Sequence, residues 1–186
     1  MAAQEPSKLS ARVRIPAVAL ILMRKNISGK SEEVALERIT KKDFPFIVRV
    51  LKKEFIKEPY NEPWTQGTAL TRVKEALKYS SETCFLIKYR GKRVGFILGS
   101  DYCYFDGRRC FIEEFAIDSK YQNKGIGSKA LKMFVEKMKS NGFAAVVLSS
   151  HKKARAFNFY KKLGFKETGW MVLEKRLKNA RKRRGK

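Results

Sequence analysis

Cysteine and histidine are scarce in this chain, which contains three cysteines and one histidine among its 186 residues. Cys84, Cys103 and Cys110 are too few and too scattered for a disulfide framework. The spacing of a zinc site is also missing, since no CxxC pair and no second histidine accompany them. The sequence therefore predicts reduced thiols, no metal centre and a cytoplasmic location.

A hydrophobic run long enough to cross a bilayer is missing as well. The longest apolar stretch near the N-terminus, "IPAVALILM" at residues 15–23, contains Pro16 and has about half of the roughly 20 residues that a membrane helix requires. A signal peptide is the alternative interpretation, but Arg24 and Lys25 follow the run where a small-residue cleavage site should lie. We therefore expect no membrane association, and Met23 is a second plausible start of the chain.

Acidic residues are few relative to basic ones: 18 Asp and Glu stand against 42 Lys and Arg, which gives a formal net charge of +24. The excess is concentrated at the ends, with eight basic residues and one acidic residue in 174–186, and six and one in the first 30 residues. Such a surface attracts polyanions by counterion release. Two interpretations stay open: a solvated, solubilising tail, or association with RNA or the ribosome through the basic ends.

Length and hydrophobic content fit a single domain. A chain of 186 residues, 44% of them hydrophobic, can close one sizeable core but is short for two. We predict a basic N-terminal extension at residues 1–30, one folded domain at 31–177 and a basic C-terminal tail at 178–186.

Apolar periodicity along the domain predicts an α/β fold. Alternating patterns indicate strands and patterns of period 3.6 indicate helices. A continuous apolar run such as "AAVVLSS" is typical of a strand buried on both faces. The expected order is β-α-α-β-β-β-α-β-α-β. The expected strands are 33–40, a hairpin within 82–104, 110–118, 144–150 and one or two closing strands in 165–177, and the expected helices are 41–58, 66–78, 127–142 and 151–164.

The stretch "YQNKGIGSKA", residues 121–130, joins an expected strand to an expected helix through two glycines. The first N–H groups of a helix have no internal partner and carry the positive end of its dipole, so such a turn binds anions. A nucleotide P-loop is excluded because the Gly-Lys-Ser/Thr ending is absent. Gly125, Gly127 and Ala130 match a dinucleotide fingerprint, but residues 144–152 lack the acid that would hold the ribose. A tight turn with glycines for geometry alone stays open at this point.

Three motifs follow one another in the second half of the chain: "FIEEFAID", "YQNKGIG" and, some thirty residues later, "AFNFYKKLGF". Together they resemble the GNAT superfamily of N-acetyltransferases, whose acetyl-CoA motif (R/Q)-x-x-G-x-(G/A) matches Gln122, Gly125 and Gly127. The resemblance spans roughly residues 34–177. Within the superfamily, these motifs are similar to the spermidine/spermine acetyltransferase branch. It implies acetyl-CoA as the cofactor and an α/β GNAT fold, with a mixed, mostly antiparallel central sheet of six to seven strands flanked by about four helices.

The resemblance assigns the glycine loop to the pyrophosphate of acetyl-CoA. The N–H groups of residues 123–128 are expected to cradle it, with side-chain contacts from Gln122 and Lys124. In family members the main chain of the preceding strand holds the pantetheine arm. Where most members have an asparagine, this chain has Lys153, so either this lysine or Asn158 is expected to contact the cofactor. The predicted cofactor-binding residues are Phe115, Ala116, Ile117, Gln122, Asn123, Lys124, Gly125, Ile126, Gly127, Ser128 and Asn158.

The resemblance also implies direct attack of an amine on the thioester. Because an amine of pKa about 10 must first lose a proton, Glu113 or Glu114 is the expected base. Neighbouring strand residues point to opposite faces, so only one of the two should reach the site, and the polyamine branch favours Glu113. Tyr160 in "FNFY" is the expected acid for the leaving thiolate, since phenols stay protonated at neutral pH. We assign no role to the cysteines and expect His151 to be exposed at a helix start.

These features predict an acetyl-CoA-dependent N-acetyltransferase that acts on a primary amine: a protein N-terminus, a lysine side chain, or a small amine or polyamine. The net charge disfavours a free polyamine unless a local acidic funnel forms, whereas a protein acceptor near RNA fits the basic ends. The competing interpretation is a GNAT-fold nucleic-acid or ribosome-associated protein with little or no catalysis. Superfamily members are often dimers, which makes a homodimer one expectation, although the sequence itself does not indicate the oligomeric state. The local acidic funnel that a polyamine acceptor would require would consist of Glu58, Glu62, Glu113 and Glu114.

Overall fold

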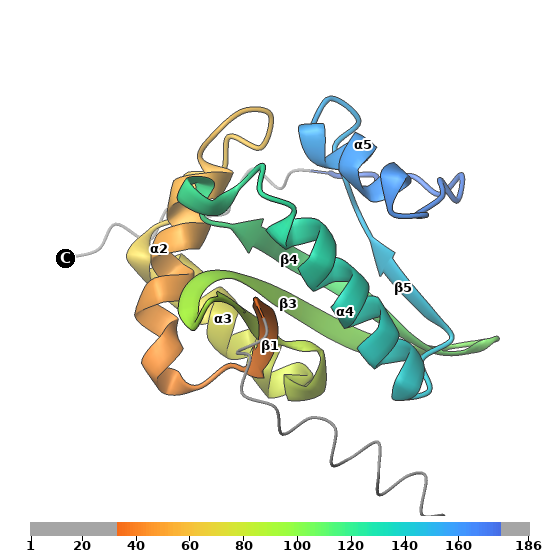
Figure 1. The fold of residues 1–186 in the computed structure, drawn as a ribbon. Coiled ribbons are helices and arrows are strands. Elements are labelled where there is room, and N and C mark those ends of the chain that lie inside the picture. Colours follow the sequence, from red (N-terminus) through yellow and green to blue (C-terminus); the bar gives the residue numbers. More distant parts are fainter. Residues whose placement is uncertain (1–32, 176–186) are drawn as a thin grey trace, which may run out of the picture. The chain divides into compact units, whose positions relative to one another are not determined.

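A computed structural model describes residues 33–175 of the chain. The predicted extension (1–30) and basic tail (178–186) lie outside these residues, so the domain boundaries stay predictions. The strands of the described part form one sheet in the order β1-β2-β3-β4-β5, antiparallel from β1 to β4 and parallel between β4 and β5 (Figure 1). They are β1 (Val34–Arg38), β2 (Phe85–Tyr89), β3 (Lys92–Tyr104), β4 (Gly107–Ile117) and β5 (Ala145–Leu148).

Helices follow the local signals of the sequence. Pro45 lies in the first turn of α2, where its missing N–H is harmless. Thr65 caps α3, its side chain accepting from the N–H of Thr68 at 3.1 Å. The α-helices of the described part are α2 (Phe44–Phe55), α3 (Gln66–Tyr79), α4 (Ile126–Ser140) and α5 (Arg155–Lys162), and its 3-10 helices are η1 (Lys41–Asp43), η2 (Ser81–Thr83) and η3 (Ser119–Tyr121).

Each face of the sheet has its own apolar core. On one face α2 and α3 bury residues such as Ile47 and Val73, and on the other α4 buries Leu131, Phe134 and Met138 (Figure 1). Burying a side chain of this size stabilises the fold by about 1.5–3 kcal/mol. The apolar residues of period 3.6 in the expected helix 127–142 are therefore those that attach α4 to the sheet.

Two expectations about the end of the domain are wrong. The described residues contain five strands rather than six to seven, because residues 165–175, where one or two closing strands were expected, form no strand. The side chains of Trp170–Leu173 are more than four-fifths exposed, so no packing holds this segment against the sheet. The strand "AAVVLSS", expected to be buried on both faces, is only half-buried as β5, since β4 is its one strand neighbour in the described part.

β4 contains one extra residue in its pairing with β3. Leu98 pairs with Glu114, but the next residue, Gly99, pairs with Ile112, which leaves Glu113 without an opposite residue. Such a β-bulge reverses the alternation of side chains along a strand. Phe115 and Ile112 accordingly pack in the same core on the α4 side although they are three residues apart.

β4 and β5 separate after a short pairing. They pair from Arg109 opposite Ala145 to Ile112 opposite Leu148, and Figure 1 shows them diverging from there. Residues 113–117 of β4 keep β3 on one side and have no strand on the other within residues 33–175. Main-chain groups along this edge are therefore available for other hydrogen bonds, apart from the carbonyl oxygen of Ile117, which accepts from the side chain of Gln122.

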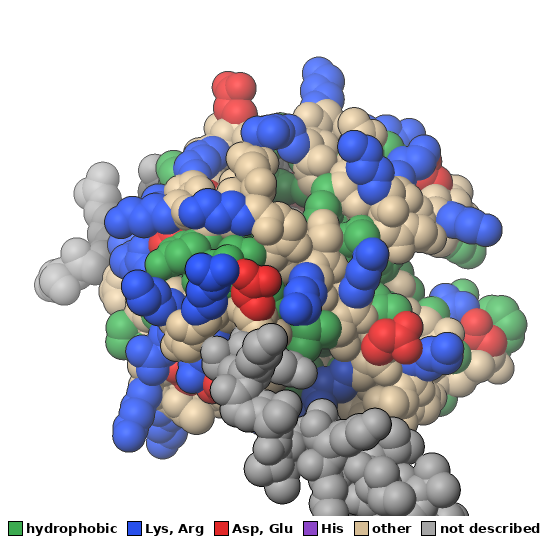
Figure 2. All heavy atoms as spheres, viewed as in Figure 1, with side chains coloured by type: hydrophobic (Ala, Val, Ile, Leu, Met, Phe, Trp, Pro, Cys, Tyr) green, Lys and Arg blue, Asp and Glu red, His purple; other side chains and the backbone are tan. Residues whose placement is uncertain are grey.

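The surface of the domain is basic even without its ends. Residues 33–175 contain 29 Lys and Arg against 16 Asp and Glu. Figure 2 shows that Lys and Arg side chains outnumber acidic ones on the visible face and gather over α2. The excess of basic residues on which the predicted attraction for polyanions rests is thus present in residues 33–175 as well as in the ends of the sequence.

Candidate active site

The glycine loop connects β4 to α4 and leaves a row of main-chain donors unpaired. Asn123 (φ 60°) and Gly125 (φ 73°) adopt left-handed conformations that turn the chain into the helix. The N–H groups of residues 123–128 have no hydrogen-bond partner in the part of the chain that the structure describes. They lie at the positive end of a 15-residue helix. The backbone geometry therefore fits an anion.

Space beside the loop is not needed by the protein's own packing. A Cβ atom at Gly127 would stand 3.5 Å from Ile117 Cγ1 and 3.6 Å from Phe115 Cζ, which is ordinary contact. At Gly125 a Cβ would meet nothing within 4 Å, so only the positive φ restricts that residue. Neither glycine relieves a clash, which agrees with room kept for a ligand.

Other predicted cofactor residues differ in what they offer. Ile126 and Ala116 are buried in opposite cores, so only their main chains can face a ligand. Ser128 is half-buried in the first turn of α4. Lys124 is exposed, with Nζ 5.8 Å above the ring of Tyr121.

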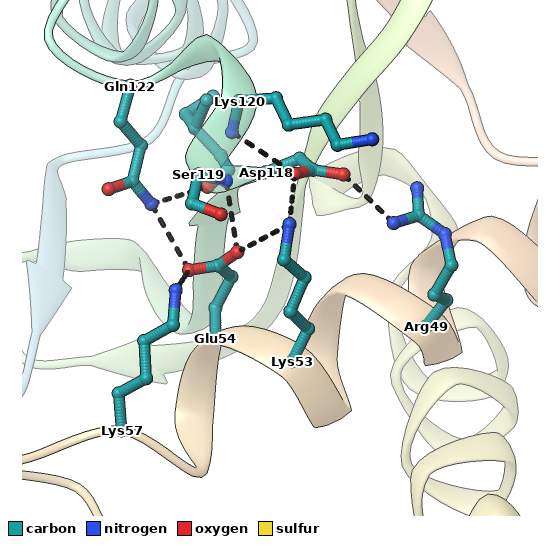
Figure 3. A network of polar contacts seen from close by, with 9 residues as sticks. Arg49, Lys53, Glu54, Lys57, Asp118, Ser119, Lys120 and Gln122 are labelled. Carbon is teal, nitrogen blue, oxygen red and sulfur yellow. Dashed lines mark hydrogen bonds and ion pairs between the residues drawn. The ribbon is translucent and has the colours of Figure 1, made fainter.

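Gln122 supports the loop through its side-chain amide. Its Nε2 donates to the carbonyl oxygen of Ile117 at 2.7 Å and to Glu54 Oε2 at 3.4 Å (Figure 3). Glu54 Oε1 accepts from the main-chain N–H of Ser119 at 2.9 Å, and Lys57 pairs with the same carboxylate. The amide nitrogen of Gln122 is thus engaged within the protein, which fits a role in shaping the loop.

Asp118 ties the start of the loop to α2. It accepts from Arg49 Nη1 at 2.9 Å and from Lys53 Nζ at 2.7 Å, and its side chain is 3% exposed (Figure 3). Burial by itself would raise the pKa of Asp118, but the hydrogen bonds from Lys53 and Arg49 outweigh it and lower the pKa to about 2. Sequence reasoning missed this carboxylate and Glu54, because their partners are 65 to 69 residues away in the chain.

Arg72 on α3 binds both predicted base candidates. Its Nε donates to Glu114 Oε1 and its Nη2 donates to Glu113 Oε2, each at 2.9 Å. The expectation that these adjacent residues face opposite sides is wrong, because the bulge at Glu113 lets both carboxylates turn towards α3. Sequence reasoning also missed Arg72, which is 41 and 42 residues from its partners.

Glu114 is the more buried of the two and lines a surface groove. Its side chain is 8% exposed, against 27% for Glu113. Burial raises the pKa of Glu114 to about 7, with Arg72 opposing the shift and Glu62 and Glu113 adding to it. Of the predicted acidic funnel, Glu62 and Glu114 line the groove and Glu58 does not. The lining residues are Glu62, Trp64, Thr65, Gly67, Thr68, Thr71, Arg72, Glu75 and Glu114.

Tyr160 on α5 lies within electrostatic range of Glu114. Its ring packs against Phe115 and Phe165, with centroids 6.5 Å and 5.7 Å away. Burial, followed by the influence of Tyr60 and Glu114, raises the pKa of the Tyr160 phenol. The hydroxyl therefore stays protonated at neutral pH, and the two predicted proton-transfer residues share one region of the molecule.

Residues 48–165 match the model of the acetyltransferase (GNAT) family, which covers more than half of the chain. The chain belongs to this family. GNAT acetyltransferases use acetyl-CoA, so the chain is an N-acetyltransferase with that cofactor, as the resemblance implies. A comparison with curated proteins finds no match.

Solved structures share the GNAT fold. A protein from Pyrococcus horikoshii OT3 is 28% identical over 75% of this chain and 93% of that one, with a TM-score of 0.62. A possible acetyltransferase from Clostridium difficile 630 has a TM-score of 0.67 at 17% identity, over 78% of this chain and 99% of that one. A predicted acetyltransferase from Clostridium acetobutylicum, solved with acetyl-CoA, has a TM-score of 0.60 at 17% identity, over 76% and 96%. The predicted α/β class and mixed sheet are confirmed.

The residues present in this GNAT domain fit acetyl-CoA. The unpaired N–H groups of residues 123–128 suit its pyrophosphate. The open edge of β4 at Phe115–Ile117 offers main-chain groups to the amides of a pantetheine arm. Both features follow from backbone geometry, so they depend little on which side chains the loop has.

In the described part of the chain, the side chains on and just before α5 that were expected to contact the cofactor are not held in place by hydrogen bonds, unlike that of Gln122 near the loop. Asn158 is exposed, and no side-chain hydrogen bond within residues 33–175 orients it or Lys153. His151 is exposed just before the helix, as expected, and accepts from the main-chain N–H of Lys153 at 3.1 Å. A cofactor contact from Asn158 or Lys153 stays a prediction.

Proposed function

We propose that this GNAT domain transfers the acetyl group of acetyl-CoA directly to a primary amine, with Glu114 as the proton acceptor and Tyr160 as the proton donor. Acetyl-CoA supplies an acetyl thioester that an uncharged amine can attack. Residues 123–128 and the edge of β4 at Phe115–Ile117 bind the cofactor. Direct attack requires no covalent bond to the protein, so the cysteines have no part in it.

The environment of Glu114 supports this proposal most strongly. It is nearly buried close to the open end of β4, it lines the groove beside α3, and its pKa is raised to about 7. A carboxylate of ordinary pKa, about 4.3, is a weak acceptor for the proton of an ammonium group. At about 7 the ionised form is present at neutral pH and is a much stronger base. Glu114 therefore takes the ammonium proton, directly or through one water molecule.

Tyr160 then serves the leaving sulfur. As the carbon–nitrogen bond forms and the carbon–sulfur bond breaks, the phenol would donate its proton to the leaving sulfur, and the second proton lost by the nitrogen would restore the phenol. Because burial raises the pKa of Tyr160, the phenol keeps its proton at neutral pH, where Glu114 with its pKa of about 7 is partly ionised. The donor comes from α5, which follows β5, and the acceptor comes from β4, the strand that diverges from β5.

The groove favours an acceptor that is itself a cation. Glu62 and Glu75 line it, and neither pairs with a cation within the described residues, although Lys and Arg are abundant. Within residues 33–175, the carboxylate of Glu62 accepts only from Trp64 Nε1, at 2.7 Å. The charge of Arg72 is offset by its two carboxylate partners. An aliphatic ammonium group is thus attracted here despite the net charge of the chain, and a lysine side chain, a protein N-terminus or a small amine can supply it.

An acetyl-CoA turnover assay that follows free thiol tests this function across polyamines, amino acids, lysine peptides and N-terminal peptides. We expect turnover with at least one class of cationic amine, and a fall in kcat/KM of about 10²-fold or more in Glu114→Gln. Glu136→Gln, which neutralises an exposed glutamate on α4, is the matched control. Wild-type turnover by Glu114→Gln would falsify the assignment of the base.

Association with RNA or the ribosome, a homodimer and a cytoplasmic location stay proposals. The basic ends lie outside the described residues, while the domain surface itself is basic (Figure 2). None of the helices within residues 33–175 has the length and apolar character to cross a membrane. The RNA proposal requires binding that weakens as salt is raised, since it rests on counterion release.

A further inference from the structure

The contact between Arg72 and two carboxylates differs from an ordinary ion pair. One planar guanidinium donates through Nε to Glu114 and through Nη2 to Glu113. Glu113 is held from its other oxygen by Ser100 Oγ at 2.6 Å. A continuous set of contacts therefore runs from β3 through Glu113 and Arg72 to the proposed base, Glu114.

The bulge in β4 is what permits this arrangement. Without the extra residue at Glu113, adjacent side chains would alternate and Arg72 would meet Glu114 alone. With it, a single cation is divided between two acids, and neither carboxylate receives the whole of its charge. Arg72 is 30% exposed, so its guanidinium is partly shielded from water and its direction is set by these partners.

We propose that Arg72 and Glu113 are positioning residues for Glu114: Arg72 orients the base, and Glu113 anchors Arg72 and takes up part of its charge, so that the base keeps its ability to accept a proton. This inference rests on the proposed function of Glu114. It gives Glu113, the base candidate favoured by the family resemblance, an indirect role.

The groups that face Glu114 act on it with opposite signs. Burial raises its pKa, Arg72 lowers it, and Glu62 and Glu113 raise it. Glu75 on α3 lines the same groove. Among tyrosines nearby, Tyr160 lies within electrostatic range of Glu114 and Tyr60 within range of Glu62, and both are uncharged at neutral pH because burial raises their pKa values. Removing Arg72 and removing Glu113 should therefore move the protonation of Glu114 in opposite directions.

The pH profile of kcat/KM in the acetyl-CoA assay tests the inference. Arg72→Gln should move the acidic limb of the profile to higher pH by about 1 unit or more, because the favourable cation is lost. Glu113→Gln should move it to lower pH by a smaller amount, because a like charge is lost and Arg72 turns fully to Glu114. Arg72→Lys keeps the charge without the two-pronged donor, so the limb should stay near its wild-type position while kcat falls.

Exposed residues on α4 provide the matched controls, Lys139→Gln for the loss of a cation and Glu136→Gln for the loss of an acid. Opposite displacements of the limb in Arg72→Gln and Glu113→Gln support the positioning role. A limb that moves in the same direction in both, or in neither, overturns it. If Arg72→Gln does not give a native melting curve, the near-isosteric Glu113→Gln decides alone through the direction of its shift.

The same experiment separates this inference from the proposed function. If the acidic limb persists unchanged in Glu114→Gln, Glu114 is not the base and both conclusions are lost. If the limb disappears in Glu114→Gln but keeps its position in the Arg72 and Glu113 variants, only the positioning role is lost. The three profiles therefore lead to different conclusions.

Discussion

Glu114, in the last part of β4, and Asp118, directly after it, are almost equally buried, with 8% and 3% of their side chains exposed, yet their pKa values shift in opposite directions. Burial raises the pKa of Glu114 to about 7, whereas hydrogen bonds overcome burial at Asp118 and lower the pKa to about 2. The difference lies in the cations. Asp118 has Arg49 and Lys53 as partners, but Glu114 shares Arg72 with a second acid. Burial alone thus does not decide which form a carboxylate takes.

The two regions accordingly suit different tasks. On the loop side, Asp118 and Glu54 stay ionised and hold the start of the loop against α2, and the groups left for a ligand are main-chain N–H donors. On the groove side, the groups left for a ligand are side chains, and one of them can change its protonation near neutral pH. Variants that damage one side and spare the other test this division.

The largest effect is expected on the loop side, from Gly125→Glu. The substitution places a carboxylate among N–H groups that suit pyrophosphate, so acetyl-CoA binding should be lost in calorimetry. Gly142→Glu is the matched control: its φ of 80° is close to the 73° of Gly125, and its Cβ also meets nothing within 4 Å. Both variants bear the same backbone strain. Cofactor binding that survives in Gly125→Glu would remove the loop from the cofactor site.

A second, smaller effect is expected away from the loop, from Tyr160→Phe on α5. Loss of the phenolic proton should lower kcat by about 10²-fold while acetyl-CoA affinity changes little, because the ring keeps its packing on Phe115 and Phe165. Tyr79→Phe, at a tyrosine that is 74% exposed, controls for the chemical change. An unchanged kcat would exclude Tyr160 as the proton donor.

The comparison also explains what the sequence could predict. The loop depends on a glycine spacing, a strand before it and a helix after it, all within about twenty residues, so local patterns predicted its conformation. The helices and most strands were predicted for the same reason, since their periodicity is local. The prediction of a closing strand was wrong because its apolar residues, Trp170 to Leu173, are exposed. Whether such residues are packed depends on tertiary structure and not on the local pattern.

The groove could not be predicted in this way. Its geometry depends on the bulge at Glu113, which reverses the alternation that a strand pattern assumes, and on Arg72, which belongs to a helix 41 and 42 residues earlier. An arginine on an amphipathic helix resembles many other surface residues, so no local pattern distinguishes it. Two adjacent glutamates were a visible signal, but which one is buried, and with which cation, is decided by the folded chain.

The smallest expected effect is on thermal stability, where Asp118 and Glu114 should differ in how their contributions depend on pH. For Asp118, whose folded pKa lies below the ordinary 3.8, the stabilisation is complete above that value and is lost only as the pH falls towards 2. Asp118→Asn should therefore lower the melting temperature equally at pH 5 and pH 8, by an amount that corresponds to about 1–3 kcal/mol. For Glu114, whose folded pKa lies above the ordinary 4.5, stability is lost as the pH rises through about 7.

Glu114→Gln cannot ionise, so it should escape that loss. Its melting temperature relative to wild type should rise between pH 5 and pH 8, with each kcal/mol of difference worth about 2–4 °C. Thermal melts of the wild type and both variants at the two pH values measure this directly. If the melting-temperature difference between Glu114→Gln and the wild type is the same at pH 5 and pH 8, as it should be for Asp118→Asn, then Glu114 titrates like an exposed acid. The sharing of Arg72 between two carboxylates would then have no effect on the protonation of Glu114.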